Sequence, residues 1–228
     1  MAKVSAIVSA YYAEEFIEGR IRNLADQSLK PEIVVVCQRG SKEEIIVNDL
    51  GDMVNTIIVT DDIPTVYDAW NMGIEKATGD FITNANSDDR LYPGALAAMY
   101  AMLNKKPQYA VAYTDLDIVE EIDGPQVGRF NWLEGGLEEL KHGCFLGPMP
   151  MWRKSLHDKY GYFNPAFHSA GDYEFWMRLA EGGEKFFHIR QPMGAYLKRK
   201  ESIEHRESLR SVWETARVRA KYRDELWQ

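Results

Sequence analysis

The first 84 residues alternate between short apolar runs, typical of buried strands, and stretches whose apolar residues recur at helical spacing. Strands that alternate with helices through short connections form parallel sheets covered by helices on both faces. We therefore expect an α/β fold with a Rossmann-like, mostly parallel central sheet. The predicted strands are Val4–Ser9, Glu32–Cys37, Asn55–Thr60 and Phe81–Asn84, and the predicted helices are residues 13–28, 42–50 and 66–77.

From Pro93 onward the pattern is more mixed. Because neither a repeat nor a low-complexity linker divides the chain, we expect one domain over residues 1–228. The predicted elements are, in order, a helix at about residues 93–104, a strand at Tyr109–Asp117, a loop rich in Gly, Pro and acids at Glu120–Gly136, an amphipathic helix from about Gly171 and a helical stretch within Ser202–Gln228.

The composition argues against several classes of protein. With 45% hydrophobic and 27% charged residues, the chain of 228 residues has the profile of an ordinary soluble globular protein. Its net charge of -8 argues against nucleic acid as a partner, because binding to a phosphate backbone needs clustered Lys and Arg. Cys37 and Cys144 lie far apart, which suggests neither a disulfide framework nor a structural zinc site. We expect Cys37, which lies in an apolar run, in the core.

The N-terminal sequence MAKVSAIVSAYYAEE has one Lys and only a short apolar run, so it makes a poor signal peptide. No segment approaches the roughly 18 apolar residues of a membrane span. We therefore expect a cytoplasmic protein, and we leave open a peripheral association with a membrane and the formation of a homo-oligomer.

Polar residues follow three of the predicted strands where each ends: Ser9–Tyr12, Gln38–Ser41 and Asn84–Arg90. Ligands of open α/β sheets bind beyond the carboxyl ends of the strands, so we expect these loops to line one crevice. In the last loop Asp88 and Asp89 are adjacent. Adjacent carboxylates repel unless water, a cation or hydrogen-bond donors surround them. This loop is therefore either a solvated turn or a metal site.

Four segments carry a family resemblance: VSAIVSAYY, EIVVVCQRGS, AWNMGIEKATGDFITNANSDDR and SAGDYEFWMRLAEGG. In this order they resemble the inverting family 2 glycosyltransferases of the GT-A fold, over most of residues 3–200. The resemblance implies transfer of a sugar from a nucleoside-diphosphate sugar to a hydroxyl of a glycan, glycolipid, polysaccharide or other lipid-linked acceptor. It also implies a nucleotide-sugar-binding half at about residues 1–92, a small mixed acceptor and catalytic half at about 93–200, and a C-terminal helical tail at 201–228.

The resemblance places a metal site in the loop after the fourth strand, at a motif like Asp-x-Asp. A departing nucleoside diphosphate develops negative charge, which Mn²⁺ or Mg²⁺ stabilises, and oxygen ligands suit these hard cations. Asp88 matches the metal-binding position of the family. Asp89 is a second candidate ligand, with the alternative role of capping the helix that follows Pro93. Asn86 replaces the first acid of the motif, so the site has one negative charge fewer.

The loops after the first two strands hold further candidates for nucleotide-sugar binding. Ser9 lies at the end of the first strand, and Tyr11 matches a family tyrosine that packs on the base or, alternatively, only supports the loop. Gln38 and Arg39 stand where the family has an acidic pair, so recognition of the base stays open. Arg39 either stacks on the base, faces a phosphate or is simply exposed to solvent.

Four candidates for nucleotide-sugar binding come from other parts of the chain. Asn86 and Ser87 belong to the acidic loop. Asn71 resembles a helix residue that faces the nucleotide pocket, with an amide that only lines the core as the alternative. Arg199 lies in a run of three cations at residues 198–200, where the family often has a metal-binding His. It is either a cation that neutralises the diphosphate or part of a solvated lid.

The catalytic base is expected in a second acidic cluster, GDYEFW. Inverting transfer requires a carboxylate that takes the proton from the acceptor hydroxyl as this hydroxyl attacks the anomeric carbon. The resemblance assigns this role to Asp172. The alternative is an acid that stabilises the first helical turn through the helix dipole. Glu174 lies on another side of the helix, and we expect it to be structural.

Other classes of protein fit less well. A Rossmann dehydrogenase needs a Gly-x-Gly-x-x-Gly turn after the first strand, and Ser9–Glu14 has no glycine. The competing hypothesis is a catalytically degenerate GT-A domain that binds a sugar nucleotide or a partner protein without turnover. It is motivated by Asn86 and by the Gln38–Arg39 pair.

Overall fold

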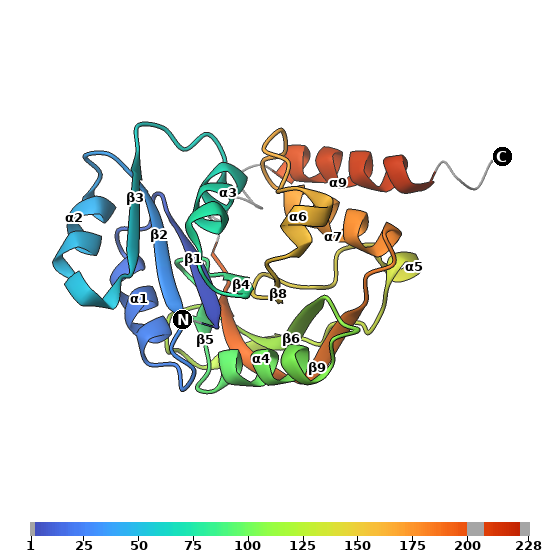
Figure 1. Cartoon of the computed structure of the whole chain (residues 1–228), viewed down its shortest axis with the longest axis horizontal. Coiled ribbons are helices and arrows are strands. Elements are labelled where there is room, and N and C mark those ends of the chain that lie inside the picture. The colour runs from blue at the N-terminus through green and yellow to red at the C-terminus, as the bar shows by residue number, and fades with distance from the viewer. Residues whose placement is uncertain (1–2, 200–207, 224–228) are drawn as a thin grey trace.

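The structure is a computed structural model that describes residues 3–199 and 208–223. Within these residues one sheet of nine strands runs through the molecule, with helices on both faces (Figure 1). Its strands are, in spatial order, β3 (Thr56–Thr60), β2 (Glu32–Gln38), β1 (Val4–Ala10), β4 (Phe81–Asn84), β8 (Met151–Arg153), β6 (Val111–Val119), β9 (Phe186–Leu197) and β5 (Arg90–Leu91), while β7 (Gln126–Phe130) pairs with β6.

The first four strands in sequence are all parallel. Ile7 of β1 is paired with Val34 of β2 on one side and with Asn84 of β4 on the other. The next strand, β8, pairs antiparallel with β4, and β6 pairs antiparallel with β8 but parallel with β9. The predicted α/β fold with a mostly parallel sheet and a mixed second part is therefore confirmed.

Two apolar clusters cover the two faces of the sheet. On one face, α1 (Ile17–Ala25), α2 (Lys42–Asp49) and α4 (Ala95–Lys105) pack on the sheet. On the other face lie α3 (Val66–Lys76), α5 (Leu137–Leu140), α6 (Leu156–Tyr160) and α7 (Gly171–Glu181). A short 3₁₀-helix, η1 (Gly51–Met53), precedes β3.

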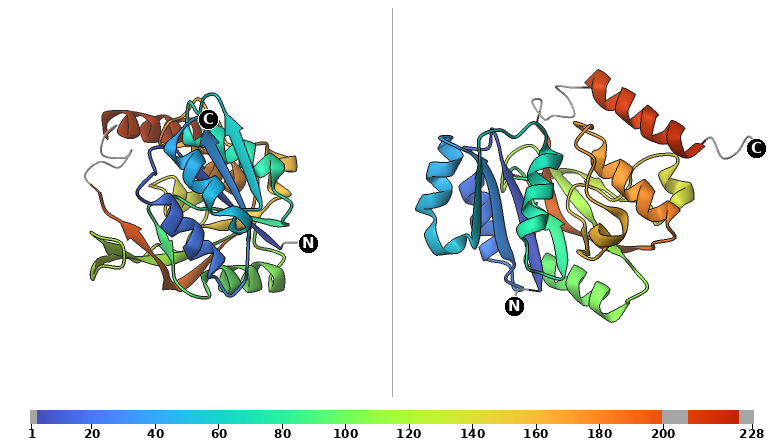
Figure 2. Two further views of the ribbon diagram at one scale, coloured as in Figure 1. Left: turned by 90° about the vertical axis from the view of Figure 1, so that its left-hand side faces the viewer. Right: turned by 45° about the horizontal axis from the view of Figure 1, so that its top comes forward.

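The helix α9 (Ser208–Arg223) lies outside α7, at the periphery of the molecule in every view (Figures 1 and 2). It is attached through Val218 and Tyr222, which are buried in the same apolar cluster as α7. The predicted helical stretch in the C-terminal tail is thus present within the described residues. No helix among them is long and apolar enough to cross a membrane.

Two details differ from the predictions. The segment Glu120–Gly136 is not wholly a loop, because β7 forms a ribbon with the end of β6. The side chains of β7 are mostly exposed, so its sequence lacks the apolar alternation that marks a half-buried strand. The helix after Pro93 begins at Ala95 behind a left-handed Gly94 with no side-chain cap, so Asp89 does not cap it.

Candidate active site

The loops after β1, β2 and β4 leave the sheet at one edge, because these strands are parallel. Hydrogen bonds tie the first two loops together: the backbone N–H of Ala13, after β1, donates to Glu43 Oε1 of α2 at 2.7 Å. The loop after β4 begins with a bond from the Ala85 N–H to the Ile7 carbonyl at 2.8 Å. The predicted crevice edge therefore exists, and the candidate side chains can be placed on it.

The candidate base-binding residues lie on the outer part of this edge. Tyr11 is exposed, and its ring lies 4.3 Å from that of Tyr12, centroid to centroid. Arg39 Nε donates to Asp61 Oδ1 at 2.7 Å, and Gln38 Nε2 donates to the Asp61 carbonyl at 3.3 Å. Both side chains of the Gln38–Arg39 pair thus contact the loop after β3, and Arg39 is largely exposed, as one of its alternatives predicted.

Asp89 lies at the bottom of the acidic loop and is only 1% exposed. Its Oδ1 accepts from the Leu197 N–H at 3.3 Å, and its Oδ2 accepts from Asn86 Nδ2 at 3.2 Å. Burial, with the negative charge of Asp88 adding to it, raises the pKa of Asp89 to about 7. Both carboxylate oxygens of Asp89 are therefore engaged inside the protein, while Asp88 is the more accessible acid of the pair.

Asp88 is held by a cation from the far end of the chain. Arg199, which follows β9, donates from Nη2 to Asp88 Oδ2 at 2.5 Å. The guanidinium of Arg199 also lies 4.7 Å from the centroid of the Phe16 ring. The candidates Asp88 and Arg199, 111 residues apart in sequence, are thus brought together.

Two arginines that sequence reasoning missed lie behind the acidic loop. Arg90 Nη1 donates to the carbonyls of Ser87 and Asp89 at 2.9 and 2.8 Å. Arg20 of α1 is fully buried, and burial lowers its pKa to about 10, although the charges of Asp89 and Asp88 oppose this. Within the described residues, Nε and Nη2 of Arg20 have no hydrogen-bond partner. The one signal in the sequence was a cation at an apolar position of a predicted helix.

The acidic loop fits a divalent cation through one carboxylate. In the described part of the chain, no three His, Cys, Asp or Glu side chains gather as a metal-binding group. Mg²⁺ sites for phosphate substrates commonly use one or two carboxylates, with phosphate oxygens and water completing the shell. Asp88 meets that requirement if the cation replaces Arg199 on it or shares its carboxylate, whereas the buried Asp89 is better placed to orient the loop.

Asp172 lies in the first turn of α7, and Tyr67 of α3 donates its hydroxyl to Asp172 Oδ1 at 3.1 Å. Tyr67 is in the first turn of the helix that follows β3, so this contact lies near the carboxyl edge of the sheet. The two helices approach closely because residue 171 is glycine: a Cβ there would lie 2.7 Å from the Tyr67 ring. The candidate base is therefore fixed against α3.

A buried carboxylate from α9 holds the segment that leads into α7. Glu214, 2% exposed, accepts from the backbone N–H groups of His168, Ser169 and Ala170 at 2.9 to 3.1 Å. Burial alone would raise the pKa of Glu214, but these hydrogen bonds outweigh it and lower the pKa. Sequence reasoning missed Glu214, although it is the single acid on a buried stripe with Val218 and Tyr222, four residues apart along α9.

Asn71 lies on the seam between α3 and the second half of the chain. Its Nδ2 donates to the Phe163 carbonyl at 2.8 Å, and its Oδ1 accepts from the Phe163 N–H at 3.1 Å. This geometry matches the alternative of an amide that lines the core. Glu174 is buried in ion pairs with Arg178 and Lys221, at 2.7 and 3.3 Å, as expected for a structural acid.

The model of the family described as Glycosyl transferase family 2 matches residues 5–170, well over half of the sequence. The chain belongs to glycosyl transferase family 2. The matched range includes every candidate from Ser9 to Asp89 and ends just before Asp172. Asp172, Arg199 and Glu214 therefore lie outside the family match.

Relatives in sequence include one protein named as a glycosyltransferase and one named as a chondroitin synthase. The chain is 24% identical over 186 residues to the uncharacterized glycosyltransferase YwdF of Bacillus subtilis, covering 78% of this chain and 68% of that protein. It is 27% identical over 191 residues to the chondroitin synthase of Pasteurella multocida, covering 82% of this chain but only 20% of the synthase. The family 2 chain thus spans about a fifth of that larger relative.

Solved structures share the GT-A fold of this family 2 chain. TarS 1–349 of S. aureus, in a complex with UDP-GlcNAc, has a TM-score of 0.78 at 20% identity, over 96% of this chain and 66% of that fragment. A mannosyltransferase of Pyrobaculum calidifontis, in a complex with GDP-Man and Mn²⁺, has a TM-score of 0.73 at 17% identity, over 96% of this chain and 63% of that one. In sequence and in fold the protein is a family 2 glycosyltransferase.

Proposed function

We propose that the protein is an inverting glycosyltransferase that moves a sugar from a nucleoside-diphosphate sugar to a hydroxyl acceptor by direct displacement. One observation carries the proposal: Asp172 is fixed by Tyr67 near the same edge of the sheet as the acidic loop after β4, in a chain of glycosyl transferase family 2. A family 2 fold with one carboxylate for a diphosphate-bound cation and a second, fixed carboxylate supports this reaction.

The donor is proposed to lie across the loops after β1, β2 and β4. Ser9, Tyr11, Gln38 and Arg39 would contact the nucleoside, while Asn86, Ser87 and Arg199 would contact the sugar diphosphate. Asn71 stays a weaker candidate, because its amide is engaged by the Phe163 backbone. Complexes of structural relatives with UDP-GlcNAc and GDP-Man support a nucleotide sugar as the donor.

Asp88 would hold Mn²⁺ or Mg²⁺, with Asp89 supporting the loop from below. When bound, such a cation supplies a positive charge that stabilises the departing diphosphate. Arg199, already on Asp88, would turn toward the diphosphate and add a second positive charge. Asn86 donates to Asp89 and would keep the acidic loop in shape without adding charge.

Asp172 would act as the general base. Its carboxylate would accept the proton of the acceptor hydroxyl while the hydroxyl oxygen forms a bond to the anomeric carbon from the face opposite the leaving group. The bond between the anomeric carbon and the diphosphate oxygen breaks at the same time, so the nucleoside diphosphate leaves and the configuration inverts. The Tyr67 hydroxyl orients the carboxylate for this step.

The acceptor is proposed to be a glycan or a lipid-linked saccharide that binds to the part of the chain after β4. This part is proposed to form one domain with the donor site. Assembly of a polysaccharide, as the name of the chondroitin synthase suggests for that relative, fits such an acceptor. A homo-oligomer remains compatible with this function.

The test is release of nucleoside diphosphate from a panel of UDP, GDP and dTDP sugars with Mn²⁺, for the wild type, Asp88→Ala and Asp172→Ala. We expect the Asp172 variant to lose about 10²- to 10⁴-fold in rate while it still binds nucleotide, as for loss of a general base. The Asp88 variant should lose its response to Mn²⁺. Asp49→Ala, at an exposed site on α2, is the matched control and should keep full activity.

The second candidate function is a degenerate GT-A domain that binds a sugar nucleotide without turnover. Asn86 in the metal motif and the burial of Asp89 favour it, because both weaken the charge offered to a cation. If all variants and the wild type were inactive on the whole panel while nucleotide binding persisted, this second function would replace the first.

A further inference from the structure

The helix α9 has two apolar faces. Its inner face, Glu214, Val218 and Tyr222, is buried against the protein. Its outer face carries large apolar side chains that are open to solvent: Leu209 is 86% exposed, Val212 68% and Trp213 60%. Ala216 and Ala220 are also exposed and, at 100° per residue, continue the same outer face. A surface helix normally turns polar side chains outward, so this exposed apolar face indicates an interaction surface.

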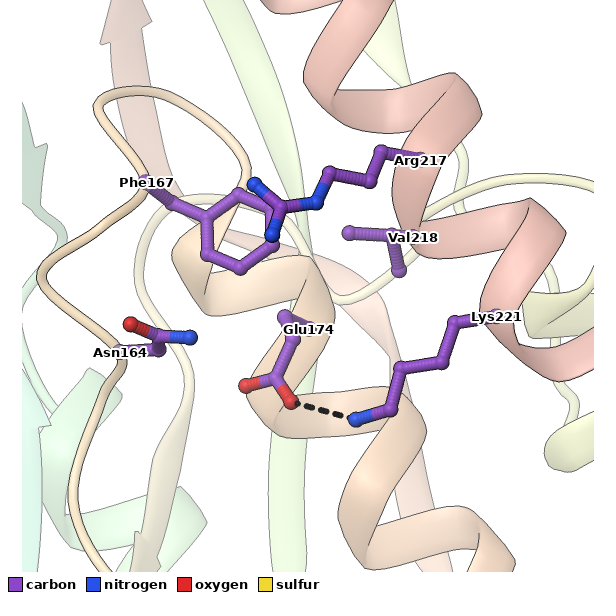
Figure 3. Close-up of a pocket in the computed structure, with 6 residues that line it drawn as sticks. All are labelled: Asn164, Phe167, Glu174, Arg217, Val218 and Lys221. Carbon is purple, nitrogen blue, oxygen red and sulfur yellow. Dashed lines mark hydrogen bonds and ion pairs between the residues drawn. The ribbon is translucent and has the colours of Figure 1, made fainter.

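The packing of α9 fixes which face points outward. Figure 3 shows Val218 and Lys221 of α9 directed toward α7, where Lys221 forms the ion pair with Glu174, and Arg217 beside Phe167. Together with Glu214 these contacts hold the inner face in place. The outer face is therefore directed away from the body of the molecule, at its periphery (Figure 2).

The charges along α9 are mostly basic, although Lys221 and Arg210 pair with Glu174 and Glu214 of the inner side, at 3.3 and 3.9 Å. Within Ser208–Arg223 there are five basic residues and one acid, and that acid, Glu214, is buried on the inner face. The whole chain, in contrast, has a net charge of -8. Arg217 lies over the rings of Phe167 and Trp213, at 5.4 and 5.6 Å from their centroids, and so borders the apolar face. The basic residues of α9 are Arg210, Arg217, Arg219, Lys221 and Arg223.

We propose that the outer face of α9 docks the protein on an anionic lipid surface. A helix with an exposed Trp and Leu on one face and basic residues at its borders suits the boundary between headgroups and acyl chains. Anionic headgroups attract the basic border, and the long stems of Arg and Lys extend the apolar contact. A second copy of the chain is a poorer occupant, because two basic α9 helices face to face would repel.

This inference goes beyond the proposed function and does not depend on it. It also gives α9 two roles, since the same helix carries Glu214 to the segment before Asp172. Docking through α9 would hold the α7 side of the molecule close to the lipid surface. A lipid-linked acceptor would then be presented from the surface on which the protein rests.

The test is flotation of the 228-residue protein with vesicles of phosphatidylcholine alone or mixed with phosphatidylglycerol. We expect the protein to float with the anionic vesicles only, and less so as salt is added, because salt screens the attraction. Trp213→Ser and Leu209→Ser should each weaken the binding by about tenfold, as the loss of one inserted apolar side chain predicts. Thermal melting should show that both variants remain folded.

Leu133→Ser is the matched control, because Leu133 is 64% exposed but lies far along the chain from α9. It should bind vesicles like the wild type. Equal binding to neutral and anionic vesicles, no binding to either, or an equal loss in the Leu133 variant would each overturn the proposal. So would a dimer in sedimentation velocity that Trp213→Ser dissociates, since the face would then belong to a second copy.

The vesicle result is separable from catalysis. Asp172→Ala should float like the wild type, since Asp172 is not on α9. Loss of turnover with intact flotation would support Asp172 as the base and leave the docking proposal unaffected. Full turnover in that variant would contradict the assignment of the base, and flotation would still test α9.

Discussion

Asp88 and Asp172 are the two accessible acids of the candidate site, and the protein holds them in different ways. Asp88 is joined to Arg199 by one ion pair that is partly exposed on both sides. Asp172 lies in a helix whose start is held by a buried carboxylate, Glu214, and it accepts a hydrogen bond from Tyr67. The proposed donor side of the site is therefore adjustable, and the proposed catalytic side is preorganised.

The difference has a chemical reason. A group that binds a diphosphate and its cation must exchange partners in every cycle, so a contact that is easily replaced serves it well. A general base must be positioned relative to the acceptor hydroxyl with a precision of roughly a few tenths of an ångström. Its support therefore has to be rigid before the substrate arrives.

The largest effect on this contrast is expected from Glu214→Ala. Three backbone N–H groups before α7 would lose their acceptor, Asp172 would shift, and kcat should fall by about 10- to 100-fold with the donor KM unchanged. Glu214→Gln keeps an acceptor oxygen and should recover most of the rate. Steady-state kinetics on the folded variants measure both.

Val218→Ala is the matched control, since it loosens α9 through the apolar contact alone. It should lower the melting temperature and leave kcat intact. A double variant with Asp172→Ala sharpens the test: if Glu214→Ala slowed the residual rate by its full factor in that background, Glu214 would support the fold and not the base.

A smaller effect is expected when acid protonates His157, which packs against α7. His157 accepts from Trp152 Nε1 at 2.9 Å, and its ring stacks on Phe175 of α7 at 5.0 Å. Burial lowers the pKa of His157 from 6.5 to about 4. The neutral ring therefore contributes fully above about pH 6.5, and its contribution declines as the pH falls toward about 4, by about 2 kcal/mol near pH 5.

Urea unfolding at several pH values checks this. His157→Gln cannot gain a charge and should flatten the loss of stability between neutral pH and about pH 5. His142→Gln, at the surface, should follow the wild type. An unchanged pH dependence in the His157 variant would show that another group makes the catalytic half sensitive to acid.

The smallest effect is expected at Arg199. Arg199→Ala frees the carboxylate of Asp88, so Mn²⁺ should bind about two- to fivefold more tightly, as for the loss of a partly exposed ion pair. Titration calorimetry without donor measures this, and the neighbouring Lys198→Ala, whose side chain is exposed, is the control. Weaker Mn²⁺ binding in the Arg199 variant would mean that Arg199 and the cation do not compete.

The same contrast explains what the sequence could predict. The strands and helices up to Asn84 follow from local periodicity, because β1, β2 and β4 are buried on both sides, β3 is half-buried and the helices turn apolar residues to the sheet. The acidic loop follows from its place at a strand end, and Asp88 and Arg199 were both singled out, but their ion pair was not predicted. Asp172 could be singled out only through family resemblance.

The rest depends on contacts between distant segments. The carboxylate of Glu214 accepts hydrogen bonds from N–H groups about 45 residues earlier in the chain. The residue pattern of a single helix does not predict such a partner. Arg20 occupies an apolar position of α1 beneath the acidic loop, which only the folded chain shows. The sequence left the amide of Asn71 either facing a nucleotide or lining the core, and only the folded chain shows that it contacts the Phe163 backbone.

The seam along α3 also limits how the molecule can move. Tyr67 and Asn71, one helical turn apart, join α3 to Asp172 and to Phe163. A hinge that opened the two halves at α3 would have to break both contacts together. We therefore expect the opening that admits a donor on the other side of the crevice, where the Arg199 side chain is the one contact described for the Asp88 carboxylate. Hydrogen exchange should accordingly be slow at the backbone amides of Phe163 and Lys198, which both donate hydrogen bonds, and faster at that of Arg199.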